Sequence, residues 1–226
     1  MFIVKRFFIA FILSAAVISN CFADYIHDIP VETIEGTLTS PLYEPHYEYD
    51  ISFSNLQMNI ELRLYRRGLD PALAQFWEAG IENTWNHKFD IADRDFHYHI
   101  NFDVVFCSVL SSSVHHSIDW AYNTTARDAA HKVGHLIGLY DEYTGGMLDP
   151  SNPIIDSTSI MSDLGTAVYD RHYQAFLDWV EPYADGRRLF LTEYGADWVS
   201  PEIPEPASAF LVICGAGLLG LQNRKR

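Results

Sequence analysis

The sequence has little cysteine, with three residues in 226, and only Cys107 lies between the two apolar ends of the chain. A single thiol cannot form an internal disulfide, so the domain must depend on its hydrophobic core, with or without a bound metal. Hydrophobic residues make up 48% of the chain and aromatic residues 14%. This is enough apolar material for one medium-sized domain with a core. We expect Cys107 to be a small buried residue at the end of a strand.

Basic residues are also scarce, since 15 lysines and arginines stand against 30 aspartates and glutamates, a formal net charge of −15. Several of the basic residues lie at the extreme ends of the chain, so the central part is more acidic still. Binding to nucleic acid requires a basic surface that can neutralise phosphates. The composition therefore excludes nucleic acid as the expected partner and is typical of a protein kept soluble outside the cell by its charge.

Long apolar runs are confined to the two ends. At the N-terminus, Lys5 and Arg6 precede the apolar run 7–18, and small residues follow at Cys21 and Ala23. This pattern predicts a secretory signal peptide, residues 1–23, with cleavage after Ala23. The run is short for a membrane span, although a membrane anchor and lipoprotein processing at Cys21 remain alternatives. Residues 24–50 then form an N-terminal extension, rich in proline, tyrosine and acidic residues, with one expected strand near 31–38.

The C-terminus carries a second targeting pattern. The triplet Pro204, Glu205 and Pro206 precedes an apolar run, 207–221, and a basic cluster ends the chain. Physically this is a short transmembrane segment held by positive charge on the cytoplasmic side. The tail, 201–226, resembles the PEP-CTERM sorting signal of Gram-negative bacteria. That resemblance implies an exosortase as partner, transient anchoring in the inner membrane, and delivery to the cell envelope or extracellular matrix. A plain C-terminal anchor is the alternative.

The central part, 51–200, predicts one α+β domain. Alternating apolar residues predict strands at 58–64 and 96–106, with a short edge strand at 114–120. Between the first two, apolar residues recur at helical spacing after Asp70, which can cap the helix. A second helix begins after Thr125, also a capping residue, with Asp128 three positions on as its capping-box partner.

The second helix carries the sequence "HKVGHLIGLYD", in which His131 and His135 lie one helical turn apart. Both imidazoles therefore project from one face, a spacing that suits two ligands of a tetrahedral zinc ion. Gly138 ends the helix with a sharp turn, after which Asp141 can return as a third, oxygen ligand. Buried structural histidines are the alternative interpretation.

This motif resembles that of the metzincin zinc peptidases with aspartate as third ligand, H-E-x-x-H-x-x-G-x-x-D. Downstream, "STSIMSDLG" resembles the Met-turn of these enzymes, with Met161 beneath the metal, and a helix with an apolar face follows at 169–180. The resemblance covers 52–181. It implies a zincin-like fold with a twisted, mostly parallel sheet, an edge strand packed on the active-site helix, and a C-terminal helix after the Met-turn. It also implies a cleft in which an extended peptide lies along the edge strand.

Lys132 is the main departure from this family. Metzincins have glutamate at this position, where it is the general base that takes a proton from zinc-bound water. A lysine is an ammonium at neutral pH, and neutralising it would cost about 4 kcal/mol. We therefore expect a zinc-binding protein that is a weak or inactive peptidase homologue. An active peptidase with an altered base and a non-enzymatic surface or matrix protein are the alternatives, and a polypeptide or a matrix polysaccharide is the expected ligand.

Other polar residues in or near this motif are candidates for further roles. Asp128 lies four residues before Lys132, so the two can form a helical ion pair. Glu142 is a candidate substitute base, His172 a candidate extra ligand, and Tyr140 or Tyr143 a candidate oxyanion donor. Of the remaining histidines, His97 and His99 are expected on a solvated sheet face, while His115 and His116 point to opposite sides of their strand.

Overall fold

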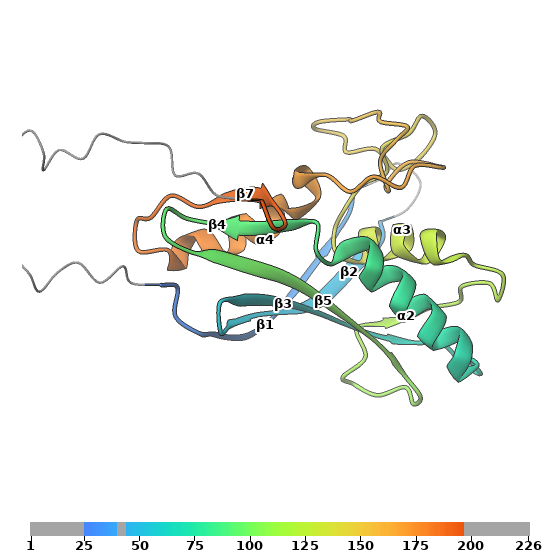
Figure 1. The fold of residues 1–226 in the computed structure, drawn as a ribbon. Helices are drawn as coiled ribbons and strands as arrows, with labels where there is room; N and C mark the ends of the chain where they lie inside the picture. The colour runs from blue at the N-terminus through green and yellow to red at the C-terminus, as the bar shows by residue number, and fades with distance from the viewer. Residues whose placement is uncertain (1–24, 40–43, 197–226) are drawn as a thin grey trace, which may run out of the picture. The chain divides into compact units, whose positions relative to one another are not determined.

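The computed structural model describes residues 25–39 and 44–196 (Figure 1). They form an α+β fold with seven strands in one mixed sheet. The strands are β1 Ile29–Thr37, β2 His46–Ser54, β3 Gln57–Tyr65, β4 Phe89–Ala92, β5 His97–Cys107, β6 His116–Ser117 and β7 Phe190–Glu193. The helices are α2 Pro71–Trp85, α3 Ala126–Leu136 and α4 Gln174–Val180, with short 3₁₀ turns η1 Asp170–Tyr173 and η2 Glu181–Tyr183 beside α4.

The sheet has the strand order β1-β2-β3-β5-β4-β7, and β6 pairs with the end of β3. Only β3–β5 and β3–β6 are parallel, whereas β1–β2, β2–β3, β4–β5 and β4–β7 are antiparallel. The expected mostly parallel sheet is therefore wrong. One reason is local: β2 and β3 are joined by Asn55 and Leu56, whose φ angles are 53° and 62°. Two successive residues with positive φ make the tight turn of an antiparallel hairpin.

The N-terminal extension contributes to the same sheet as the rest of the domain. Its described part forms β1 and the first half of β2, so the boundary expected between residues 50 and 51 falls inside a strand. The predicted signal peptide and sorting tail lie outside the described residues. Within the described residues, no helix is long and apolar enough to cross a membrane.

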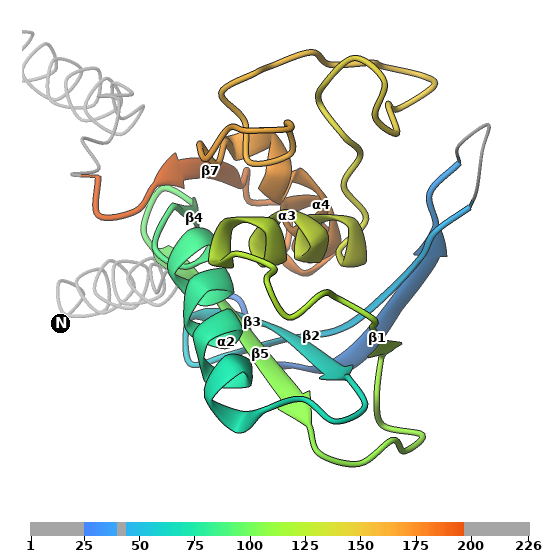
Figure 2. The same ribbon diagram turned by 90° about the vertical axis from the view of Figure 1, so that its right-hand side faces the viewer.

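The helix α2 forms where the sequence predicts it and makes the parallel crossover between β3 and β5. Asp70 caps it, because its side chain accepts a hydrogen bond from the Ala72 amide at 2.8 Å, and Pro71 occupies the first turn. Its buried face carries Trp77, Ile81 and Trp85. Figure 2 shows α2 beside α3 above the sheet. This packing places the motif helix α3 against the core.

Trp85 connects the two helices. It is fully buried, and its indole donates a hydrogen bond to the Ala130 carbonyl of α3 at 3.1 Å. Tyr173, from the segment before α4, donates its hydroxyl to the Trp85 carbonyl. Three elements therefore meet at one residue, Trp85.

We expect Trp85→Ala to lower the free energy of unfolding by about 3–5 kcal/mol, because it leaves a large cavity and the Ala130 carbonyl loses a donor. Urea denaturation followed by tryptophan fluorescence and circular dichroism measures this. Phe76→Ala on the same helix is the control, since Phe76 is 52% exposed, and it should cost less than about 1 kcal/mol. Equal effects of the two substitutions would contradict the assigned packing.

Candidate metal centre

The helix α3 holds the two motif histidines in a fixed relation. Thr125 caps its N-terminus, with its side chain accepting from the Asp128 amide at 3.1 Å. The helix ends at Leu136, and Gly138 follows with φ of 91°, a conformation that favours glycine. This left-handed turn reverses the chain, so that Asp141 returns to the face of α3 that carries His131 and His135.

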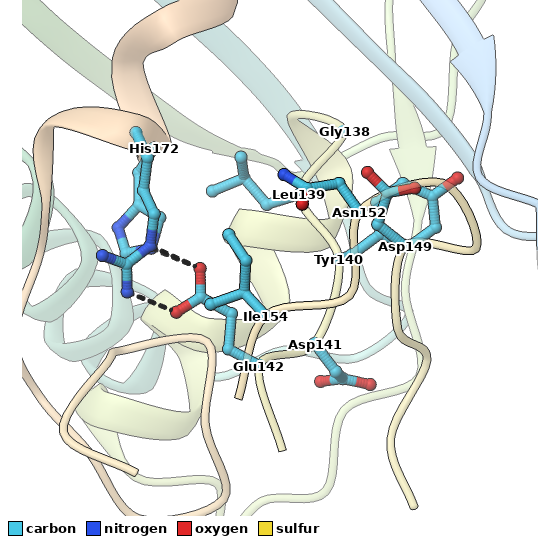
Figure 3. A pocket seen from close by; sticks show the side chains of 10 residues that line it. Gly138, Leu139, Tyr140, Asp141, Glu142, Asp149, Asn152, Ile154 and His172 are labelled. Atoms are coloured by element: carbon cyan, nitrogen blue, oxygen red, sulfur yellow. Dashed lines mark hydrogen bonds and ion pairs between the residues drawn. The ribbon is translucent and has the colours of Figure 1, made fainter. Parts of the chain in front are cut away.

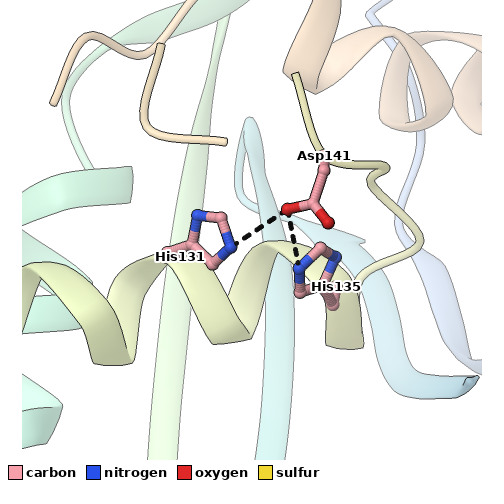
Figure 4. Close-up of side chains that lie close together, drawn as sticks. All are labelled: His131, His135 and Asp141. Atoms are coloured by element: carbon pink, nitrogen blue, oxygen red, sulfur yellow. Dashed lines mark ion pairs between the residues drawn. The ribbon is translucent and has the colours of Figure 1, made fainter. Parts of the chain in front are cut away.

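The structure brings together the three predicted ligands (Figure 4). Asp141 Oδ1 lies 3.3 Å from His131 Nε2 and 3.4 Å from His135 Nε2. Asp141 is buried, whereas the side chains of His131 and His135 are 14% and 20% exposed. Solvent therefore reaches the group from the side of the imidazoles. Among the described residues, this is the one group of three or more histidine, cysteine or acidic side chains close enough to hold a metal ion.

The histidine rings are oriented by backbone carbonyls. His131 Nδ1 lies 2.9 Å from the Ile160 carbonyl, and His135 Nδ1 lies 2.9 Å from the Leu139 carbonyl. A carbonyl only accepts, so each Nδ1 carries the proton and donates it. In the neutral rings the lone pair of each Nε2 then faces Asp141, the orientation that second-shell hydrogen bonds give to metal-binding histidines.

The carboxylate of Asp141 has one satisfied oxygen and one orphan. Oδ2 accepts a hydrogen bond from the Met147 amide at 2.6 Å, but the buried Oδ1 has no hydrogen-bond partner. Burial opposes ionisation of Asp141, whereas the hydrogen bond from the Met147 amide favours the carboxylate form. An ionised oxygen that faces two nitrogen lone pairs repels them unless a cation lies between. The His131, His135 and Asp141 group could therefore hold a metal ion.

Met161 lies against the inner side of α3. It is fully buried, and a β-carbon added at Gly134 would collide with its sulfur. Its turn is held by a hydrogen bond from the Met161 amide to Ser159 Oγ at 3.0 Å. The neighbouring carbonyl, that of Ile160, is the one that orients His131. The turn predicted to underlie the metal thus contacts the motif helix at the glycine between the two histidines.

Glu142 does not face this group. Its buried carboxylate is clamped by Arg171, whose Nε and Nη2 lie 2.9 and 2.7 Å from the two oxygens, and His172 Nε2 lies 3.3 Å away. Figure 3 shows the Glu142 and Asp141 carboxylates pointing in different directions. Burial would raise the pKa of Glu142, but Arg171 and His172 lower it well below its usual value. The geometry therefore gives no support to Glu142 as a substitute base.

This cluster fastens the Asp141 segment to its surroundings. The Glu142 amide donates to the Met161 carbonyl at 2.8 Å, and Arg171 also pairs with Asp156 at 2.8 Å. The cluster borders a cavity of 260 Å³ whose lining includes Asp141, Glu142 and Arg171 (Figure 3). Sequence reasoning missed Arg171, because its partner lies 29 positions away and no local spacing signals the pair.

His172 is a structural residue and not part of the three-residue group. It is 3% exposed, its Nδ1 accepts from the Tyr169 amide at 3.1 Å, and its Nε2 faces Glu142. Tyr140 also has a structural contact, since its hydroxyl accepts from the Thr39 amide at 3.0 Å. Neither contact places these side chains among the motif residues.

Lys132 lies on the exposed side of α3 and does not form the expected ion pair with Asp128. Asp128 instead pairs with its neighbour Arg127 at 3.3 Å and contacts Thr125 at the helix start. Hydrogen bonding to Thr125, opposed by burial and assisted by Arg127, lowers the pKa of Asp128. Helical spacing permitted the Asp128–Lys132 pair, but the side chain of the adjacent Arg127 contacts Asp128 instead.

The remaining predicted residues lie outside this group. His99 is exposed as expected, although its Nδ1 contacts the buried Asp90 at 2.9 Å. His115 contacts the Arg63 amide, and His116 the backbone of Glu48. Both have a lowered pKa, caused first by burial.

Three comparisons with known proteins were negative: no family model, no curated protein and no solved structure matches this chain. The structure defines the protein as an α+β domain with a His131, His135 and Asp141 group that could hold a metal ion.

We expect Arg171→Met to lower the free energy of unfolding by about 3 kcal/mol, because it leaves the Glu142 carboxylate buried without a cation. Denaturant titration measures this. The double variant with Glu142→Gln should recover part of the loss. Arg188→Met, at an exposed arginine, is the control and should change the free energy by less than about 0.5 kcal/mol. An Arg171→Met protein as stable as this control would contradict the assigned role of the ion pair.

Proposed function

We propose that His131, His135 and Asp141 bind a zinc ion in a metzincin-like domain. The observation that carries this is the pair of separations from Asp141 Oδ1 to the two Nε2 atoms, 3.3 and 3.4 Å. Tetrahedral zinc with bonds of about 2.0–2.2 Å to nitrogen and oxygen requires ligands about 3.3–3.6 Å apart. The donor set also favours zinc over calcium or magnesium, which prefer oxygen ligands alone.

Features around the group support the resemblance to metzincins. The motif helix ends at a left-handed glycine, and Met161 packs beneath it at Gly134. The strand β3 pairs in parallel with β5 on one side and with β6 on the other, and α2 and β4 lie between β3 and β5 in the chain. The antiparallel strands β1 and β2, at the N-terminal end of the described residues, are not among the features that support the resemblance.

The proposed protein is a weak or inactive peptidase homologue. Three protein ligands leave one position of a tetrahedral zinc ion open, and zinc there supplies a Lewis acid. Hydrolysis of a peptide also requires a group that accepts a proton. Lys132 is a cation at that position, and the carboxylate of Glu142, the residue after Asp141, is paired with Arg171.

We also propose that the protein is exported by its signal peptide, residues 1–23, and sorted by an exosortase through residues 201–226. It would then act in the envelope or extracellular matrix of a Gram-negative bacterium, on a polypeptide or a polysaccharide. The net charge of −15 supports a soluble domain there and not a nucleic-acid partner.

The purified protein should contain one zinc ion per chain by elemental analysis. Zinc at a free concentration 100 times its dissociation constant should stabilise the fold by about 2.7 kcal/mol, and a chelator should remove that gain. His135→Ala should lose the bound metal, whereas His97→Ala, outside the group, should keep it. A wild-type protein whose thermal unfolding is indifferent to both zinc and chelator would overturn the proposal.

Lys132→Glu should create chelator-sensitive cleavage of an unstructured peptide, because it restores a carboxylate base beside the metal. General-base catalysis contributes about 10²–10⁴-fold in rate, so the variant should exceed the wild type by a factor in this range. Lys132→Gln is the matched control that removes the charge without adding a base. Wild-type cleavage that His135→Ala abolishes would show instead that the protein is an active peptidase.

A further inference from the structure

The open side of the metal group is next to an exposed lysine. Successive residues of an α-helix are about 100° apart, so Lys132 leaves α3 about 100° from His131 and about 60° from His135. In helices with the H-E-x-x-H pattern, the residue after the first histidine is the one that serves the open position of the metal. Lysine has a longer and more flexible side chain than glutamate. The Lys132 ammonium can therefore reach a molecule bound there.

The lysine has no counter-charge in the part of the chain that the structure describes. Asp128, one turn earlier, is engaged by Arg127, and Glu142 is engaged by Arg171. Asp141 is buried and faces the imidazoles. The chain has 30 acidic residues, yet none of those described pairs with Lys132. The positive charge of Lys132 is therefore free to attract an anionic ligand.

We propose that the site binds the carboxylate group of a ligand, with one oxygen at the open position of the metal and the other accepting from Lys132. This inference rests on the proposed metal. The divalent ion, Asp141 and Lys132 together carry a charge of about +2, whereas a glutamate in place of Lys132 would repel an anion. With lysine in place of glutamate, the open position would bind an anion instead of activating water.

A carboxylate fits these groups better than a phosphate. Its two oxygens match two partners, the metal and one ammonium. Phosphate sites usually add arginines or several backbone amides. The arginines next to this group are committed elsewhere, since Arg127 donates to the carbonyls of Gly165 and Ser162 and Arg171 holds Glu142.

The test uses the purified full-length chain loaded with cobalt, whose visible spectrum reports a change of ligand at the open position. Acetate is titrated at constant ionic strength. Because a hydrogen bond to a charged group is worth a factor of ten or more, Lys132→Met should weaken acetate binding at least about tenfold. Lys132→Glu should abolish it. Arg188→Met is the control, because it removes one exposed positive charge outside the group, and its acetate affinity should equal that of the wild type.

Each outcome of this experiment tests a different part of the proposal. A chain that takes up neither cobalt nor zinc overturns the proposed function and this inference with it. Normal metal uptake with equal acetate affinity in wild type and Lys132→Met overturns this inference alone. Inorganic phosphate binding more tightly than acetate, with the same dependence on Lys132, overturns the choice of a carboxylate.

Discussion

One buried oxygen constrains the whole site. Asp141 Oδ1 has no hydrogen-bond donor, yet it lies within 3.4 Å of two imidazole nitrogens. Leaving an ionised oxygen unpaired in the interior is costly. A cation bound by all three side chains removes both this cost and the repulsion between the lone pairs. The geometry is that of a group that could hold a metal ion.

The surroundings of the group serve to keep these ligands in place. Backbone carbonyls from the Met161 turn and from the end of α3 orient the two imidazoles. The segment that carries Asp141 is fastened by its neighbour Glu142, through Arg171 on one side and the Met161 carbonyl on the other. A polar cluster of this kind is favourable only when all its members are satisfied. Its role here is positional, because its carboxylate is directed away from the metal group.

In the proposed function, Lys132 separates the ability to bind a metal from the ability to hydrolyse a peptide. The proposed ligands lie on one face of α3 and in the turn that follows it, so their positions do not depend on the identity of residue 132. Proton abstraction, in contrast, depends on that single side chain. In the proposed function, an ammonium there removes the base and would make the open position attractive to anions, in a chain whose net charge is −15. Binding of an acidic ligand is the chemistry that we propose for this site.

Local spacing in the sequence determined the elements and the ligand trio. Thr125 and Gly138 define the ends of α3, and the intervals between the two histidines and Asp141 bring three ligands together, because all these relations lie within one helix and its turn. Only the tertiary structure decided the antiparallel pairing of most strands, the inclusion of β1 and β2 in the sheet, and the Glu142–Arg171 pair. These depend on which distant segments meet, and periodicity carries no information about that. Helical geometry also allowed an ion pair between Lys132 and Asp128. In the structure Asp128 pairs with Arg127 instead.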